Sequence, residues 1–250
     1  MHIGILKTGD LPADIAAEHG GYGDLFVRLL ENAEPSFSTE VIDVEAGEMP
    51  ASPGAADGWL ITGSKHGVYE EHPWIDPLKM FLRDCLAAEV PVVGVCFGHQ
   101  ILADAMGGRT VKSEKGWGLG VSSYAPAHSI PWAPELQAPW QGFAIHQDQV
   151  IEQPPGTTLL MTSDFCPIAA LAYGPKDAPL ALTVQPHPEY HRALFERLAE
   201  VRLKKVVPES VMARALDSLA TPVDPGPWVR TIVDFFKRAD ARRQPEARTG

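Results

Sequence analysis

The segment Val92-Val93-Gly94-Val95-Cys96-Phe97-Gly98-His99-Gln100 has the pattern of a buried strand, a tight turn and a helix. Its first four residues are apolar and mostly β-branched, as is typical of a central strand in a parallel sheet. Helical spacing of apolar residues then runs from Gly98 to Met106. The glycines flanking Cys96 suit a strained turn, because a Cβ at either position would collide with neighbouring backbone. This Gly-x-Cys-x-Gly turn predicts an α/β fold with Cys96 at a strand-to-helix junction.

Short apolar runs alternate with helical patterns on both sides of this segment, which predicts a mostly parallel sheet flanked by helices. The expected strands are Ile3–Leu6, Thr39–Val44, Trp59–Thr62, Pro91–Val95 and Leu180–Val184. The expected helices are Ile75–Ala88, Gly98–Met106, Arg192–Lys205, Glu209–Leu219, Trp228–Ala239 and one that contains Leu25–Leu30. Short strands and turns are expected between Arg109 and Val184. Residues 1–240 are predicted to form one domain, and residues 241–250 a disordered tail.

The position of Cys96 predicts a nucleophile. The turn would raise its sulfur above the carboxyl ends of the strands, where ligands bind in open α/β sheets. The helix that follows would place positive partial charge beside the sulfur and favour the thiolate. A free thiol of pKa about 8.5 would otherwise be only a few per cent ionised at neutral pH. The remaining cysteines, Cys85 and Cys166, are expected to be buried apolar residues.

A cysteine nucleophile requires a base, and His187 and Glu189 follow the expected strand Leu180–Val184. Residues two apart at a strand end point the same way, so Glu189 could orient His187 toward Cys96. A metal site built from His187, Glu189 and His191, with His146, is the competing interpretation. Its spacing matches no zinc pattern, so no metal and no cofactor are expected.

The composition and the remaining motifs exclude several classes of protein. The chain has 250 residues and a formal net charge of −11, which disfavours phosphate backbones and anionic lipid as partners. Three widely spaced cysteines and an N-terminus without a basic start argue against a secreted, disulfide-bonded domain. No run approaches the roughly 18 apolar residues of a membrane helix. We therefore expect a cytoplasmic protein with no nucleic-acid or membrane partner, and with His72 and His128 as surface polar residues.

Gly94-Val95-Cys96-Phe97-Gly98-His99-Gln100, followed far downstream by Gln185-Pro186-His187-Pro188-Glu189, resembles the paired motifs of the class I glutamine amidotransferases. The similarity extends from Ile3 to about Phe236 and is greatest to free-standing, GMP synthase-like members, a group that includes γ-glutamyl peptidases. It implies the family's flavodoxin-like sheet with a small antiparallel sheet. It also implies a catalytic triad of Cys96, His187 and Glu189.

The resemblance implies further site residues. Ile61-Thr62-Gly63-Ser64 is similar to the family's oxyanion strand, which implies oxyanion donors at the backbone N–H groups of Ser64 and Phe97. Gly63 would then allow close approach of the substrate. Gln100 matches the glutamine that contacts the amino-acid end of the substrate. Ile145-His146-Gln147-Asp148 aligns with the segment that holds the substrate from the opposite side.

Together these residues imply hydrolysis of a γ-glutamyl amide through a thioester on Cys96, with glutamine as substrate and glutamate and ammonia as products. Two alternatives stay open: a γ-glutamyl peptidase acting on glutathione-like conjugates, and a non-catalytic binding or regulatory module. The segments 65–74 and 125–140 are the expected lining of the pocket. The sequence has no Gly-x-x-x-x-Gly-Lys phosphate-binding loop, so we expect no complete GMP synthase and a separate ammonia-accepting synthase as candidate partner.

Overall fold

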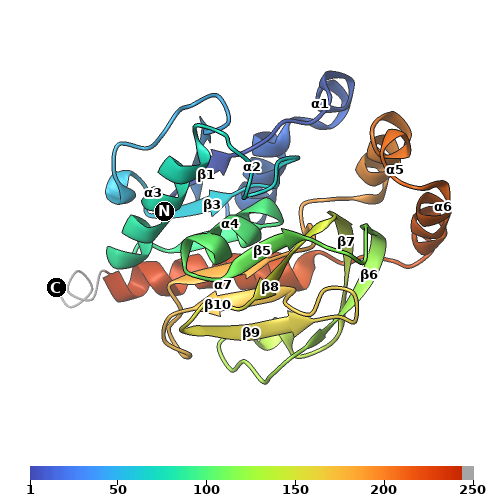
Figure 1. Cartoon of the computed structure of the whole chain (residues 1–250). Helices are drawn as coiled ribbons and strands as arrows, with labels where there is room; N and C mark the ends of the chain where they lie inside the picture. The colour runs from blue at the N-terminus through green and yellow to red at the C-terminus, as the bar shows by residue number, and fades with distance from the viewer. Residues whose placement is uncertain (244–250) are drawn as a thin grey trace.

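The computed structural model describes residues 1–243 and contains one large sheet covered by helices (Figure 1). One half of the sheet consists of parallel strands in the spatial order β2-β1-β3-β4-β11. Their bounds are β1 His2–Lys7, β2 Ser38–Asp43, β3 Gly58–Ile61, β4 Val92–Val95 and β11 Ala181–Val184. This order corresponds to the 2-1-3-4-5 arrangement of flavodoxin-like sheets. The predicted mostly parallel, helix-flanked sheet is confirmed.

The other half of the sheet is antiparallel and continues from β11 in the order β10-β9-β6-β7. Its bounds are β6 Gly118–Pro126, β7 Trp140–His146, β9 Thr157–Thr162 and β10 Ala170–Tyr173. A separate two-stranded antiparallel sheet pairs β5 (Arg109–Lys112) with β8 (Asp148–Glu152). The predicted small antiparallel sheet is therefore also present.

Helices pack on both faces of the parallel half and bury two separate apolar cores. Their bounds are α2 Tyr22–Ala33, α3 Ile75–Ala87, α4 Phe97–Ala105 and α7 Gly226–Arg243. Leu60 packs in the core that α2 and α7 cover, through residues such as Phe26 and Phe236. Its neighbours Trp59 and Ile61 pack in the core that α3 and α4 cover. Successive residues of a strand point to opposite faces, so a fully apolar strand supplies both cores.

A third group of helices lies beyond the carboxyl ends of the parallel strands (Figure 1). It comprises α1 Ala13–His19, α5 Arg192–Val201, a 3₁₀ turn η3 Leu203–Lys205 and α6 Glu209–Ser218. The sequence pattern predicted one helix over Arg192–Lys205, and the structure divides it at Arg202. The pattern did not predict α1, because Ile15 is its single buried residue and leaves no apolar stripe.

The remaining elements are two short 3₁₀ turns, η1 Pro53–Ala55 and η2 Pro134–Leu136. Helix α7 continues to Arg243, three residues into the segment expected to be a tail, and residues 244–250 lie outside the described part of the chain. Across residues 1–243, no helix combines the length and the apolar character that crossing a membrane requires.

Candidate active site

Cys96 lies in the turn between β4 and α4. Its backbone has φ 54° and ψ −101°, a conformation that residues with a side chain rarely adopt. Its N–H donates to the carbonyl of Val184 at 2.9 Å, which fixes the turn against the end of β11. The side chain is thereby held at the carboxyl ends of the parallel strands, beside the first turn of α4.

The glycines on either side of Cys96 are required by close backbone contacts. A Cβ added to Gly94 would lie 2.5 Å from the carbonyl oxygen of Gly98. A Cβ added to Gly98 would lie 2.6 Å from the carbonyl oxygen of Ile61 on the neighbouring strand. The predicted collisions are confirmed, and the turn cannot accept a larger residue at either position without shifting backbone.

His187 and Glu189 follow β11 and form a buried pair. Nδ1 of His187 lies 2.6 Å from Oε1 of Glu189. A carboxylate only accepts hydrogen bonds, so the imidazole donates through Nδ1 and leaves Nε2 for another partner. The His187 N–H donates to the carbonyl of Phe143 at 2.9 Å and ties this segment to β7. Cys96 and His187 line one cavity.

The imidazole of His187 is held in a charged environment. Burial alone lowers its pKa, but the charges of Glu189 and Cys96 and the hydrogen bond to Glu189 raise the pKa of His187 to about 10. The ring also stacks on Tyr190, with centroids 4.1 Å apart and planes 14° apart. The hydroxyl of Tyr190 is hydrogen-bonded to that of Tyr22 on α2 at 3.0 Å. Glu189 thus fixes the edge of the His187 ring, and Tyr190 packs against its face.

The backbone of Gly63 lies between these two side chains. A Cβ added to Gly63 would lie 3.0 Å from Cε1 of His187 and 3.7 Å from Cβ of Cys96. The Gly63 carbonyl accepts hydrogen bonds from the hydroxyls of Thr8 at 3.3 Å and Thr62 at 3.1 Å. The C=O and N–H of a trans peptide point in opposite directions, so the Ser64 N–H is directed away from both threonines.

Phe97 opens helix α4, so its N–H is one of the helical donors without an intrahelical acceptor. This N–H adjoins Cys96 in the chain, whereas the Ser64 N–H comes from the segment after β3. The two expected oxyanion donors therefore come from neighbouring strand ends of one sheet.

Gln185 contacts the thiol and was given no role in the sequence interpretation. Its Nε2 donates to Sγ of Cys96 at 3.6 Å, and its Oε1 accepts from Nε2 of Gln100 at 3.1 Å. Gln100 also donates to the backbone carbonyl of Asp148 at 2.9 Å. A chain of side-chain amides thus links β8 to the sulfur. Its position in the sequence could have identified it as a site residue, because Gln185 precedes His187 by two residues and faces the same way.

A cavity of about 290 Å³ opens beside Cys96 and His187. Ser64, Gln100 and all four residues of 145–148 line it. The expected contribution of segment 65–74 is found in Lys65, His66, Gly67, Tyr69 and Glu70. The expectation for residues 125–140 was wrong, since none of them lines the cavity. That segment instead packs against α7, through η2.

Residues 145–148 form the junction between β7 and β8 on the opposite wall. His146 is buried, its Nδ1 is 3.1 Å from the carbonyl of Asp148, and burial lowers its pKa to about 4. It is therefore neutral at physiological pH. Oδ1 of Asp148 accepts from the hydroxyl of Tyr69 at 3.1 Å, and burial raises the pKa of Asp148 above its ordinary value. This contact joins the two walls of the cavity.

Three comparisons identify proteins that this chain resembles. The family model of glutamine amidotransferase class-I matches residues 30–199. Gamma-glutamyl peptidase 4 of Arabidopsis thaliana is 32% identical, over 71% of this chain and 71% of that protein. A subunit of the glutamine-hydrolyzing GMP synthase of Halobacterium salinarum is 29% identical, over 70% of this chain and 87% of that protein.

The fold agrees with these relationships. The crystal structure of a glutamine amidotransferase from Methylobacillus flagellatus superposes with a TM-score of 0.72 at 20% identity, over 95% of this chain and 93% of that one. The family match spans the turn of Cys96 together with the strand and segment that carry His187 and Glu189. The chain therefore belongs to the class I glutamine amidotransferase family.

Proposed function

We propose that this protein hydrolyses γ-glutamyl amides with Cys96 as nucleophile, His187 as acid and base, and Glu189 as the residue that orients His187. The observation that carries the proposal is the convergence of three features at one end of the sheet. They are the strained turn of Cys96, the 2.6 Å His187–Glu189 pair and the cavity that Cys96 and His187 line together. Family membership and the names of the peptidase and synthase relatives support the same chemistry.

The reaction follows from these positions. The Cys96 thiol gives its proton to His187 and the sulfur attacks the γ-carbonyl carbon, so the C–S bond forms as the carbonyl oxygen takes up negative charge. His187 gives its proton to the departing nitrogen as the C–N bond breaks, which releases ammonia or an amine. Water then loses a proton to His187 and attacks the thioester. The C–S bond breaks, glutamate leaves, and the thiol–imidazole pair is regenerated.

The carbonyl oxygen needs hydrogen-bond donors in both steps. We assign these to the backbone N–H groups of Ser64 and Phe97, with the Ser64 peptide oriented by Thr8 and Thr62. Removal of one such donor typically lowers kcat by about 100- to 1000-fold. Because both donors are backbone groups, their positions depend on the residues that hold each peptide.

The charges around the cavity favour two candidate substrates, glutamine and a γ-glutamyl peptide. Lys65, Lys112 and Arg202 line the cavity together with the carboxyl groups of Glu70 and Asp148, and Lys65 also pairs with Glu45 at 3.1 Å. One of these cations suffices for the α-carboxylate of glutamine. A γ-glutamyl peptide carries a further carboxylate beyond the scissile amide, which the other cations could bind. The three cations are the specific observation that favours the peptidase as second candidate.

A substrate panel on the purified chain tests the proposal. Glutamate and ammonia would be measured with glutamine, and amino-acid release with a glutathione S-conjugate, for the wild type, Cys96→Ala and Cys85→Ala. We expect turnover of at least one substrate, complete loss in Cys96→Ala and retention in Cys85→Ala, whose thiol lies on α3. Wild-type turnover in Cys96→Ala, or none of either substrate in the wild type, would overturn it.

A non-catalytic module is the alternative of another class. A diazoketone analogue of glutamine alkylates a thiol only if the thiol is nucleophilic and the γ-glutamyl group is bound beside it. We expect the added mass on Cys96. Labelling of Cys85 with Cys96 unmodified would instead favour the module. The Halobacterium relative is named as part of a synthase, so an ammonia-accepting synthase stays a candidate partner, and co-purification with it would reveal one.

A further inference from the structure

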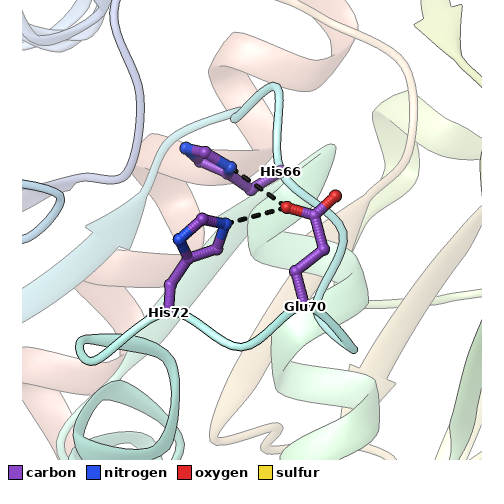
Figure 2. Close-up of side chains that lie close together, drawn as sticks. All are labelled: His66, Glu70 and His72. Atoms are coloured by element: carbon purple, nitrogen blue, oxygen red, sulfur yellow. Dashed lines mark hydrogen bonds and ion pairs between the residues drawn. The ribbon is translucent and has the colours of Figure 1, made fainter.

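The loop between β3 and α3 brings two imidazoles and one carboxylate together, as Figure 2 shows for His66, Glu70 and His72. Oε2 of Glu70 lies 3.2 Å from Nδ1 of His66 and 2.8 Å from Nε2 of His72. The two imidazole rings have centroids only 4.0 Å apart. The sequence interpretation treated His72 as a surface polar residue, but it hydrogen-bonds Glu70 and stacks on Trp74.

Each ring nitrogen of His66 lies within hydrogen-bond distance of a carboxylate oxygen. Nε2 of His66 lies 2.9 Å from Oε1 of Glu45, an acceptor that also binds Lys65 at 3.1 Å. A neutral imidazole carries a proton on only one nitrogen, so His66 can donate to Glu45 or to Glu70 but not to both. In the tautomer that donates to Glu45, the proton is on Nε2. Its Nδ1 then presents a lone pair to the lone pairs of the Glu70 carboxylate. Two lone pairs at 3.2 Å require a positive species between them, either a second proton or a metal ion.

Glu70 is suited to be the anionic member of the cluster. Its Oε2 lies within hydrogen-bond distance of both imidazoles. One ionised carboxylate and two imidazoles form the donor set of many zinc sites that keep a fourth position for water.

The distances also suit a small divalent ion. Ligand bonds of roughly 2.0–2.1 Å in tetrahedral geometry place neighbouring ligand atoms about 3.3 Å apart. The observed separations are 2.8 and 3.2 Å, and all three ligand atoms lie within 4.8 Å of one another. Glu45 on the far nitrogen of His66 supplies the carboxylate that commonly orients a metal-bound imidazole. Side-chain exposures of 16%, 42% and 32% for His66, Glu70 and His72 leave a route of entry.

We propose that His66, Glu70 and His72 bind one divalent transition-metal ion, with zinc as the ion tested, and that the ion braces the loop after the expected oxyanion strand. This departs from the expectation of no metal. The brace would act on the cavity wall, because Glu70 and His66 line the cavity and the Oγ of Ser64 accepts from the His66 N–H at 3.1 Å. The metal does not touch the reacting atoms, and its binding rests on no part of the proposed function.

The test is zinc titration of the full chain, free of any histidine tag and treated with chelator, by isothermal titration calorimetry. Cys96→Ala is the reference protein, because the thiol beside His187 could bind zinc by itself. On this background we compare His72→Ala and Glu70→Gln with two controls. Glu71→Gln alters the adjacent exposed carboxylate, and His128→Ala removes an exposed imidazole outside the cluster. Circular dichroism verifies that each variant is folded.

We expect one zinc ion per chain in the reference protein and in both controls. His72→Ala and Glu70→Gln should each weaken binding at least about tenfold. Glu45→Gln should weaken it about 10- to 100-fold without removing a ligand, which a merely exposed cluster would not show. Binding that requires Cys96, or that survives both ligand substitutions, would overturn the proposal. Glu70→Gln preserves shape at a partly exposed position, so its result does not depend on refolding around a deletion.

Discussion

Replacement of Glu189 by glutamine removes the charge that holds the His187 proton and preserves the shape of the buried pair. The pKa of His187 is about 10, and the charge of Glu189 is the largest of the causes that raise it. An opposite charge at such close range typically shifts a pKa by about 1–3 units. We therefore expect the pKa of His187 in Glu189→Gln to fall to between about 7 and 9.

The effect on activity depends on whether the protonated or the neutral form of His187 is the active one. In the proposed mechanism the imidazolium of His187 supplies the proton to the leaving amine, so activity should be lost as pH rises through its pKa. With a pKa of about 10, His187 is about nine-tenths protonated at pH 9. With a pKa of about 7, only about one hundredth is protonated at pH 9 and about half at pH 7. The loss of activity that results from the smaller protonated fraction of His187 is therefore at most about twofold at pH 7 and approaches roughly 100-fold at pH 9.

The measurement is the pH profile of kcat/KM from about pH 6 to 11 for the wild type, Glu189→Gln and Glu196→Gln. Glu196 is an exposed glutamate on α5 that pairs with Arg192, so its variant is a matched control without the buried contact. We expect the basic limb near pH 10 in the wild type and control, displaced to lower pH in Glu189→Gln. A limb that does not move in Glu189→Gln, or a wild-type limb near the ordinary pKa of about 6.5, would refute this account of His187.

Four further substitutions test separate parts of the site. Cys96→Ala should abolish turnover and change the free energy of unfolding by less than about 1 kcal/mol, by denaturant titration, because the turn is strained; wild-type turnover would contradict this. Thr8→Val should lower kcat about tenfold by removing one of the two hydrogen bonds that hold the Gly63 carbonyl, with little change in KM; an unchanged kcat would contradict it. Gly94→Ala should lower the free energy of unfolding by about 3 kcal/mol through its contact with the next turn; a wild-type melting curve would contradict it. Lys112→Gln should raise KM about tenfold for a γ-glutamyl peptide and less for glutamine; equal effects on both would remove the proposed role of the cation.

The inner strands of the parallel half, β1, β3, β4 and β11, were predictable because they are buried on both faces. Runs such as Val92–Val95 are apolar at every position, and their lengths agree with the structure within about two residues. Helix α1 was not predicted because it buries only one residue. The break between α5 and η3 at Arg202 was not predicted because the spacing of apolar residues does not change there. The antiparallel strands between Arg109 and Val184 were expected only as a group. Their order depends on pairing partners that lie far apart along the chain.

The residues of the candidate site that directly follow a buried strand were predictable from the sequence. Cys96, His187 and Glu189 each follow a buried strand, and the two strands concerned, β4 and β11, are neighbours. Gln185 and Tyr190 could not be assigned from residue type, because an amide and a phenol have no fixed role. Their contacts with the thiol and the imidazole depend on how β11 ends and where α2 packs. The cluster at Glu70 likewise requires a loop conformation that no periodicity encodes.

The position of Gly63 connects the stability of the fold with the proposed chemistry. A strand end that faces both His187 and Cys96 has no room for a side chain, so the peptide after it must be oriented by groups on its other side. Thr8 and Thr62 supply those groups from the ends of β1 and β3, and both are fully buried. An unpaired carbonyl at the buried Gly63 would cost about 1–3 kcal/mol, so the fold itself favours the orientation that directs the Ser64 N–H away from the threonines. The donor would then be in place before substrate binds, and its orientation would require no binding energy.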